Sequence, residues 1–168
     1  MDEKSIQEIG EQFKAELQTI EHAGFDLPAS ARVFSSSPKL KTSPEVAREL
    51  SAELVEAQKD KEKRRADGLQ ILSSKIELVD AREIGDKGKS DKVVAFEYLY
   101  TREMPGVVGA DAWQEMAEYE LTIDTTTNVV KGLIAKDDSY YEAIQTDEVA
   151  PNSGLGSADM PSSEFSSF

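Results

Sequence analysis

The spacing of apolar residues changes once along this chain, near residue 70. Before that point, apolar residues recur every three or four positions, which is the period of a helix that buries one side. From about residue 71 to residue 135 they recur at every second position, as they do in the strands of a half-buried sheet. The pattern therefore predicts two helices followed by an antiparallel sheet, which is an α+β domain.

The first predicted helix covers about residues 5–21. Ser5 and Glu8 match a capping box, in which each side chain binds a free backbone N–H of the first turn. Gly24 is expected to end the helix, with His22 as a cation near its C-terminal end. The apolar stripe that should face the sheet consists of Ile6, Ile9, Phe13, Leu17 and Ile20.

The second predicted helix covers about residues 43–67. Ser43 is expected to cap it, with Pro44 at the first helical position, where a missing N–H costs nothing. Its apolar face ends at Ala57, and residues 59–65 are charged all round, so the last turns should project into water. Gly68 is expected to end the helix.

Four strands are predicted, at about residues 71–84, 92–102, 112–124 and 128–136, with polar or glycine-containing turns between them. On the first strand, Leu72 is expected to share a face with Ile76 and Leu78. On the third strand one face is apolar, with Glu115 as its one exception, and Glu118 and Glu120 point the other way. The strands should form a four-stranded meander whose apolar face is covered by the two helices. The apolar face of the third strand consists of Trp113, Ala117, Tyr119, Leu121 and Ile123.

This order of elements is similar to the layout of cystatin-like and NTF2-like domains. The resemblance rests on layout, and it implies a curved sheet with room for a pocket between helix and sheet. We expect residues 1–144 to form this single domain. Residues 145–168 contain acids and small residues but no bases, and they cannot bury enough apolar area to offset the entropy of ordering. They are expected to form a flexible acidic tail.

Charge and composition narrow the classes of partner. The net charge of −14 disfavours binding to nucleic acid or to an anionic membrane, and it suits a basic protein partner. The chain has no cysteine, which excludes disulfides and thiolate chemistry, and no apolar run long enough for a membrane helix. The N-terminus does not resemble a signal peptide, so we expect a cytoplasmic protein. A secreted form from which a signal has been removed stays open, as does a homo-oligomer.

Motifs for catalysis and for cofactors are incomplete. The sequence GKS at 88–90 lacks the glycine that a P-loop needs five positions earlier, where Glu83 stands. The sequence D-x-T-x-N at 124–128 lacks the glycine and the bidentate acid of a calcium loop. His22 is the single histidine and has no nucleophile pattern beside it. We therefore expect no cofactor, no bound metal and no catalytic residue.

Two candidate binding features are left. Tyr98, Tyr100 and Trp113 could lie beside Glu118 and Glu120, where they would form an acidic-aromatic sheet face suited to a basic protein. The tail ends in aromatic residues that could act as a peptide ligand, namely Phe165 and Phe168.

Our functional hypothesis is a non-catalytic protein-binding module, such as an accessory, inhibitor-like, immunity-like or assembly subunit. It would use the acidic-aromatic sheet face or the tail. The alternative is an NTF2-like small-molecule-binding protein, or a lyase or isomerase, with a pocket between helix and sheet.

Overall fold

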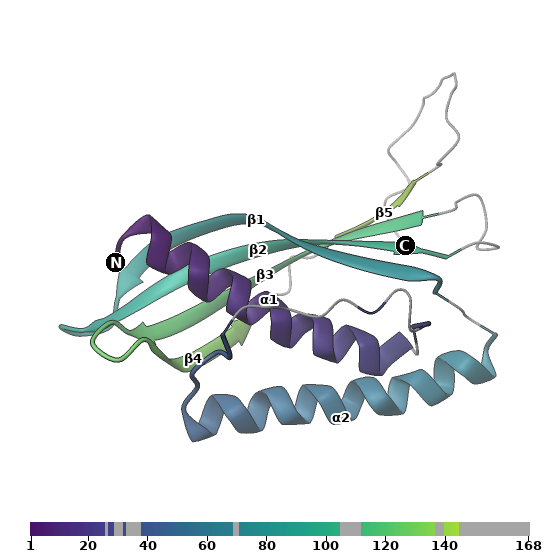
Figure 1. Cartoon of the computed structure of the whole chain (residues 1–168), viewed down its shortest axis with the longest axis horizontal. Coiled ribbons are helices and arrows are strands. Elements are labelled where there is room, and N and C mark those ends of the chain that lie inside the picture. The colour runs from purple at the N-terminus through teal and green to yellow at the C-terminus, as the bar shows by residue number, and fades with distance from the viewer. Residues whose placement is uncertain are drawn as a thin grey trace, which may run out of the picture.

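The computed structural model describes residues 1–25, 27–28, 32, 38–68, 71–104 and 112–136, and the backbone of residues 140–144. Two helices precede an antiparallel sheet, as the sequence predicts (Figure 1). In chain order the elements are α1 (Glu3–Phe25), α2 (Pro44–Ala66), β1 (Ser73–Asp86), β2 (Asp91–Glu103), β3 (Ala112–Asp124), β4 (Val129–Ala135) and β5 (Tyr140–Ile144).

The sheet contains the predicted four-stranded meander, in the order β1-β2-β3-β4, and one further strand. The outer edge of β3 is shared, because β4 pairs with its C-terminal half and β5 with its N-terminal half. Strand β5 was not predicted from the sequence. This strand has five residues, which is too few to display a period on its own.

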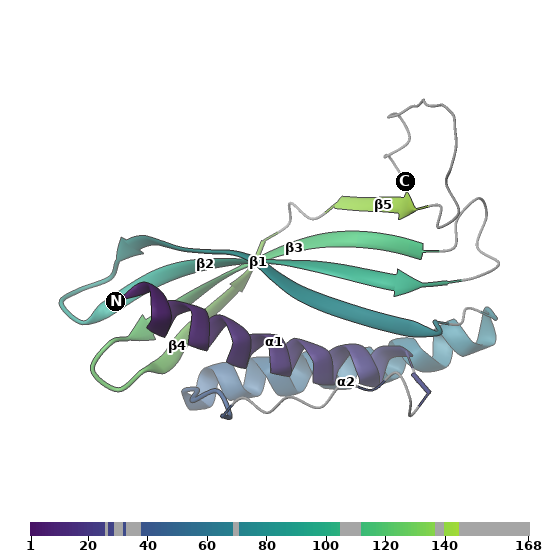
Figure 2. The ribbon, with the colours of Figure 1, turned by 45° about the horizontal axis from the view of Figure 1, so that its top comes forward.

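Both helices lie on the same face of the sheet, and they begin at the same end of it (Figure 2). Helix α1 contacts β1 and β2, whereas α2 contacts α1 and β4. The start of α2 is fixed by the residues before it. The backbone N–H of Val130 donates to the carbonyl of Lys41 at 2.9 Å, and the N–H of Ser43 donates back to Val130 at 2.9 Å.

The core fills the space between α1 and the inner face of the sheet. Phe13 is 1% exposed, and its ring centroid lies 5.9 Å from that of Tyr98 and 5.1 Å from that of Tyr119. The hydroxyl of Tyr98 donates to the carbonyl of Gly10 at 2.7 Å, so a buried polar group is paired across helix and sheet. The predicted apolar stripe of α1 supplies most of the helical side of this core.

The ends of α1 differ from the prediction. The helix begins at Glu3, and the carboxylate of Asp2 accepts the backbone N–H of Ser5 at 2.7 Å. Asp2 is therefore the cap, and the predicted capping box of Ser5 and Glu8 is wrong. The helix also continues past Gly24. Burial lowers the pKa of His22, which favours neutral imidazole over the cation that the sequence suggested.

The ends of α2 agree with the prediction. The hydroxyl of Ser43 accepts the backbone N–H of Val46 at 3.3 Å. Gly68 follows the helix with a φ of +77°, a left-handed conformation that glycine adopts without a side-chain clash. Of the residues of α2, Val46 is the buried one, so this helix lies largely at the surface.

At Gly10, α1 packs closely against the sheet, and this contact supports a testable prediction. A Cβ atom at this position would lie 2.7 Å from Leu78 Cδ2 and 2.8 Å from Phe96 Cε1. Gly10→Ala should therefore lower the free energy of unfolding by about 1–2 kcal/mol in a urea titration, despite the higher helix propensity of alanine. Gly85→Ala is the control, because an added Cβ there meets no atom within 4 Å. Equal stabilities of the two variants would contradict the close contact.

Candidate functional site

The structure separates the aromatic and acidic residues that the sequence analysis placed in one patch. Tyr98 and Tyr100 face the helices and are 0% and 7% exposed. Trp113 lies opposite Arg102 on the adjacent strand and also faces the helices. Glu118 and Glu120 alternate with these positions on β3 and point to the outer face. The predicted acidic-aromatic sheet face is therefore not formed.

On the outer face, both glutamates are paired with bases from neighbouring strands. Glu118 lies 3.7 Å from a guanidinium nitrogen of Arg82, and Glu120 lies 3.0 Å from the ammonium of Lys136. These pairs are typical of a solvated sheet surface. The two tail residues of the predicted site, Phe165 and Phe168, lie outside the described residues.

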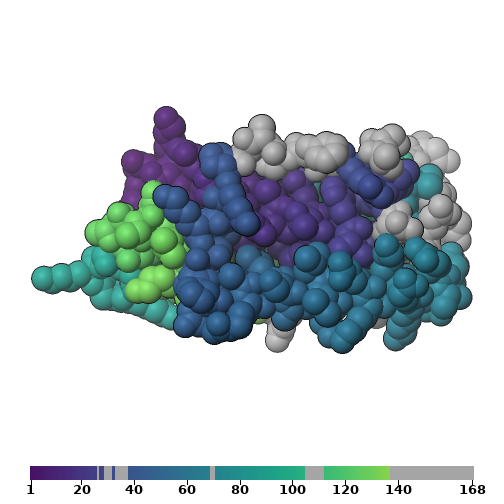
Figure 3. All heavy atoms as spheres, turned by 60° about the horizontal axis from the view of Figure 1, so that its bottom comes forward, coloured from purple at the N-terminus to yellow at the C-terminus, as the bar shows by residue number. Residues whose placement is uncertain are grey.

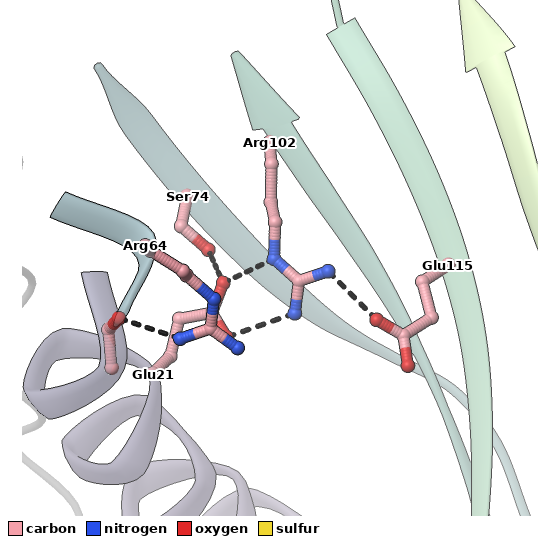
Figure 4. Close-up of polar contacts among 6 residues, drawn as sticks. Glu21, Arg64, Ser74, Arg102 and Glu115 are labelled. Atoms are coloured by element: carbon pink, nitrogen blue, oxygen red, sulfur yellow. Dashed lines mark hydrogen bonds and ion pairs between the residues drawn. The ribbon is translucent and has the colours of Figure 1, made fainter. Parts of the chain in front are cut away.

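A buried charged cluster occupies the inner face at one end of the sheet (Figure 4). We call it the Arg102 cluster, and it consists of Glu21, Ser74, Arg102 and Glu115. Arg102 binds Glu21 through two nitrogens, Nε at 2.5 Å and Nη2 at 2.9 Å, and it donates from Nη1 to Glu115 at 2.7 Å. The hydroxyl of Ser74 donates to Glu21 Oε2 at 2.6 Å. Four elements therefore meet in one hydrogen-bonded network.

Local periodicity explains how these side chains converge. Arg102 follows Tyr98 and Tyr100 at alternate positions of β2, so it shares their inward direction. The strand register places Ser74 and Trp113 opposite Arg102, on its two sides. Glu21 extends the apolar stripe of α1 by one further helical turn, which brings it over the sheet.

Burial makes the charges of this cluster interdependent. Glu21 is 6% exposed, and a buried carboxylate without a partner costs several kcal/mol. Burial alone disfavours the charged form of Arg102, but the hydrogen bonds and charges of Glu21 and Glu115 outweigh it and raise the pKa of this guanidinium. The guanidinium carbon also lies 4.9 Å from the ring centroid of Tyr100. Burial raises the pKa of the Tyr100 hydroxyl well above its usual value, so this group stays neutral.

A second arginine joins the C-terminal ends of the two helices. Arg64 Nη1 donates to the carbonyl of Gly24 at 2.7 Å, and the guanidinium carbon lies 4.1 Å from the ring centroid of Phe25. Arg102 reaches the same ring at 5.1 Å. Phe25 therefore contacts two cations, one from α2 and one from the sheet.

Two cavities lie between the helices and the inner face, with volumes of about 570 and 400 Å³. Because they share lining residues, we treat them as two lobes of one cleft. Figure 3 shows α1 and α2 side by side on the helical face of the molecule. The residues common to both lobes are Ile20, Glu21, Glu53, Arg102 and Glu115.

The lobes differ in their walls. Trp113, Phe25 and Met104 give the larger lobe an aromatic and apolar wall beside the Arg102 cluster. Glu56, Asp60 and Arg64 of α2 add charge to this lobe. The smaller lobe is bounded by core residues of α1 and the sheet, among them Phe13, Leu17, Tyr100, Tyr119 and Leu133.

Glu21, Arg102 and Arg64 were not predicted as site residues from the sequence. One signal was present in the sequence, since Glu115 interrupts an otherwise apolar strand face and Arg102 continues the Tyr98–Tyr100 alternation on the preceding strand. An acid and a base at inward positions of two successive strands indicate a buried ion pair.

Of the described residues, no helix is long and apolar enough to cross a membrane.

Comparisons with known proteins do not identify the chain. No protein family and no curated protein matches its sequence. Among solved structures, it is similar to the solution NMR structure of a de novo β-sheet design protein, at 11% sequence identity. The alignment covers 90% of this chain and 99% of the designed protein, but the TM-score of 0.30 is too low to support any conclusion about function.

Proposed function

We propose that this protein is a non-catalytic small-molecule-binding protein whose ligand occupies the cleft between the helices and the sheet. The observation that carries the proposal is the cleft itself, about 570 Å³ in its larger lobe, with an aromatic wall beside a buried ion cluster. Ligand sites in proteins usually enclose about 300–1,000 Å³ and combine apolar walls with a few fixed polar groups. A pocket between helix and sheet is also what an NTF2-like layout implies.

Binding fits the cleft better than catalysis does. Both oxygens of Glu21 accept hydrogen bonds from Arg102, and one of them also accepts from Ser74. A carboxylate engaged in this way holds a wall in place and is a poor general base. His22, the single histidine of the chain, lines neither lobe.

The wall is also rigid enough to preserve a preformed site. The Arg102 cluster joins α1 to three strands, and Arg64 ties the far end of α2 to α1. A preformed cleft reduces the entropy that is lost when a ligand binds.

The proposal can be tested with Trp113, which is the single tryptophan of the chain and lines the larger lobe. We expect its indole N–H signal to shift saturably in ¹⁵N NMR when aromatic fragments are titrated. The set should contain neutral, cationic and anionic fragments of equal size. If no fragment of any charge shifts this signal saturably at concentrations up to about 10 mM, which corresponds to roughly −3 kcal/mol, the proposal fails.

A matched pair of variants tests the location. Ile20 lies at the junction of both lobes, and Ile20→Phe adds bulk to the cleft. Thr19→Phe adds bulk at the neighbouring position, which is exposed and lines neither lobe. We expect Ile20→Phe to weaken fragment binding about tenfold, equivalent to 1.4 kcal/mol, and Thr19→Phe to leave it unchanged. Equal affinities in both variants would place the ligand elsewhere.

A second candidate function is recognition of a basic protein. It is favoured by the net charge of −14 and by apolar side chains on or next to β1, a strand at the edge of the sheet. Leu72, Val79 and Ile84 are 45%, 46% and 45% exposed. An edge strand with exposed apolar side chains is a typical surface for a protein partner. Salt-sensitive capture of a basic protein from the native host, lost when Val79 and Ile84 are replaced by Lys, would support this candidate.

A further inference from the structure

We infer that the ligand of the cleft is a small organic cation, an amine or guanidinium attached to a flat apolar body. This inference rests on the proposed function and adds the chemical class of the ligand. It is drawn from the charge of the lining residues, from the partners that the two arginines already have, and from the aromatic rings of the wall.

The larger lobe carries an excess of negative charge. Among the described residues, its lining contains five acids and two arginines. The five acids are Glu21, Glu53, Glu56, Asp60 and Glu115, and the two arginines are Arg64 and Arg102. Three of the five acids, Glu53, Glu56 and Asp60, are exposed along α2, so the excess lies at the rim of the lobe, where salt screens it. Such a lobe attracts cations and repels anions.

Both arginines of the larger lobe already have partners within the protein. Each of the three guanidinium nitrogens of Arg102 already donates to a carboxylate of the cluster. Arg64 donates to the carbonyl of Gly24 and lies 3.9 Å from Asp60. The charge of Arg102 is therefore offset by two carboxylates, and an anionic ligand at either arginine would lie beside acids of the protein that repel it.

The acids, in contrast, retain accepting positions. Glu53 lines both lobes and forms no ion pair with any residue in the described part of the chain. Glu115 binds Arg102 through Oε1, and within the same part its Oε2 accepts no hydrogen bond. Together these two side chains offer carboxylate oxygens from α2 and from β3, on different sides of the shared region.

The rings of the cleft already bind cations of the protein itself. Arg64 and Arg102 lie 4.1 and 5.1 Å from the ring centroid of Phe25, and Arg102 lies 4.9 Å from that of Tyr100. Cations lie favourably over aromatic faces at such distances. Trp113, whose indole is the best cation-binding ring, lines the same lobe. In an incoming amine with an aromatic body, the cationic group suits the acids and ring faces of the cleft, and the aromatic body suits its apolar wall.

Three probes that share one body test the inference by isothermal titration calorimetry. They are phenethylamine, which is cationic at pH 7, the neutral 2-phenylethanol, and the anionic 3-phenylpropionate. We expect phenethylamine to bind at least ten times more tightly than the alcohol, and the carboxylate to bind least. Raising the salt concentration should reduce the preference for the amine, because ions screen the attraction.

One pair of variants assigns the preference to the cleft. Glu53→Gln should reduce the affinity for phenethylamine about five- to tenfold and leave that for 2-phenylethanol unchanged. Glu62→Gln removes the same charge from the same helix, but Glu62 lines neither lobe, so this variant should bind all probes as the parent protein does. Equal effects of the two variants would overturn the assignment.

The outcomes separate this inference from the proposed function. If the probes shift the Trp113 indole signal but bind with equal affinity, or if the carboxylate binds best, the cation inference is wrong and the proposed function stands. If no probe or other fragment shifts that signal, both are wrong. Selective, saturable binding of the amine that is lost in Glu53→Gln supports both.

Discussion

Replacing Phe13 with alanine is expected to lower the free energy of unfolding by about 3–5 kcal/mol, because the substitution leaves a cavity at the centre of the core. The side chain is 1% exposed and packs edge-on against Tyr119 and beside Tyr98, so it joins α1 to both central strands. The neighbouring rings are held in the sheet and cannot move far enough to fill the space. Urea denaturation followed by circular dichroism measures the change.

Phe13→Leu is the matched control for this prediction, since it retains most of the apolar volume. We expect it to cost less than half as much as the alanine variant. A loss below about 1 kcal/mol for Phe13→Ala would mean that α1 does not pack on the sheet as described.

Removal of the positive charge of Arg102 is the second change with a large expected effect. Arg102→Met leaves Glu21 buried with Ser74 as its remaining hydrogen-bond donor, and it leaves Glu115 without its cation. Breaking a buried ion pair on one side costs about 3–5 kcal/mol, because the remaining charge is neither solvated nor neutralised. Urea denaturation at pH 7 measures this loss.

Two controls separate the buried charge from lost packing. Arg82→Met removes an arginine of β1 whose partners, Asp80 and Glu118, lie on the outer face, so it should change stability little. Adding Glu21→Gln to Arg102→Met should recover part of the lost stability, because the uncompensated charge is then gone. If the double variant is as unstable as Arg102→Met alone, the cost does not arise from the charge of Glu21.

Element types and the inward direction of the strand residues could be predicted from the sequence because both are local. A period of 3.6 or 2 depends on neighbours within one turn or one pleat. This was sufficient to place Tyr98 with Tyr100, and to separate Trp113 from Glu118 and Glu120. The predicted acidic-aromatic patch combined residues of both faces, Trp113 with Glu118 and Glu120, and the same alternation already argued against it.

Bulges show where the local rule ends. The pairing of β1 with β2 shifts between Leu78 and Asp80 and again between Glu83 and Gly85. An inserted residue reverses the inward and outward positions that follow it, which a strict alternation cannot anticipate.

Leu72, which was expected to share the face of Ile76, precedes β1 and is 45% exposed.

The Arg102 cluster could not be predicted because it depends on contacts between distant parts of the chain. Glu21 and Arg102 are 81 residues apart. Their meeting depends on how α1 is rotated about its axis and on the register of three strands. With 33 acids in the chain, nearly every base has an acid within plausible reach, so composition could not single out this pair.

Intermolecular NOEs between phenethylamine and the protein test the central claim most directly, namely that the cleft between the helices and the inner face is the binding site. We expect NOEs from the phenyl ring of the probe to Trp113 and Phe25, which line the larger lobe. NOEs to outer-face residues such as Ile134, with none to Trp113 or Phe25, would contradict the account.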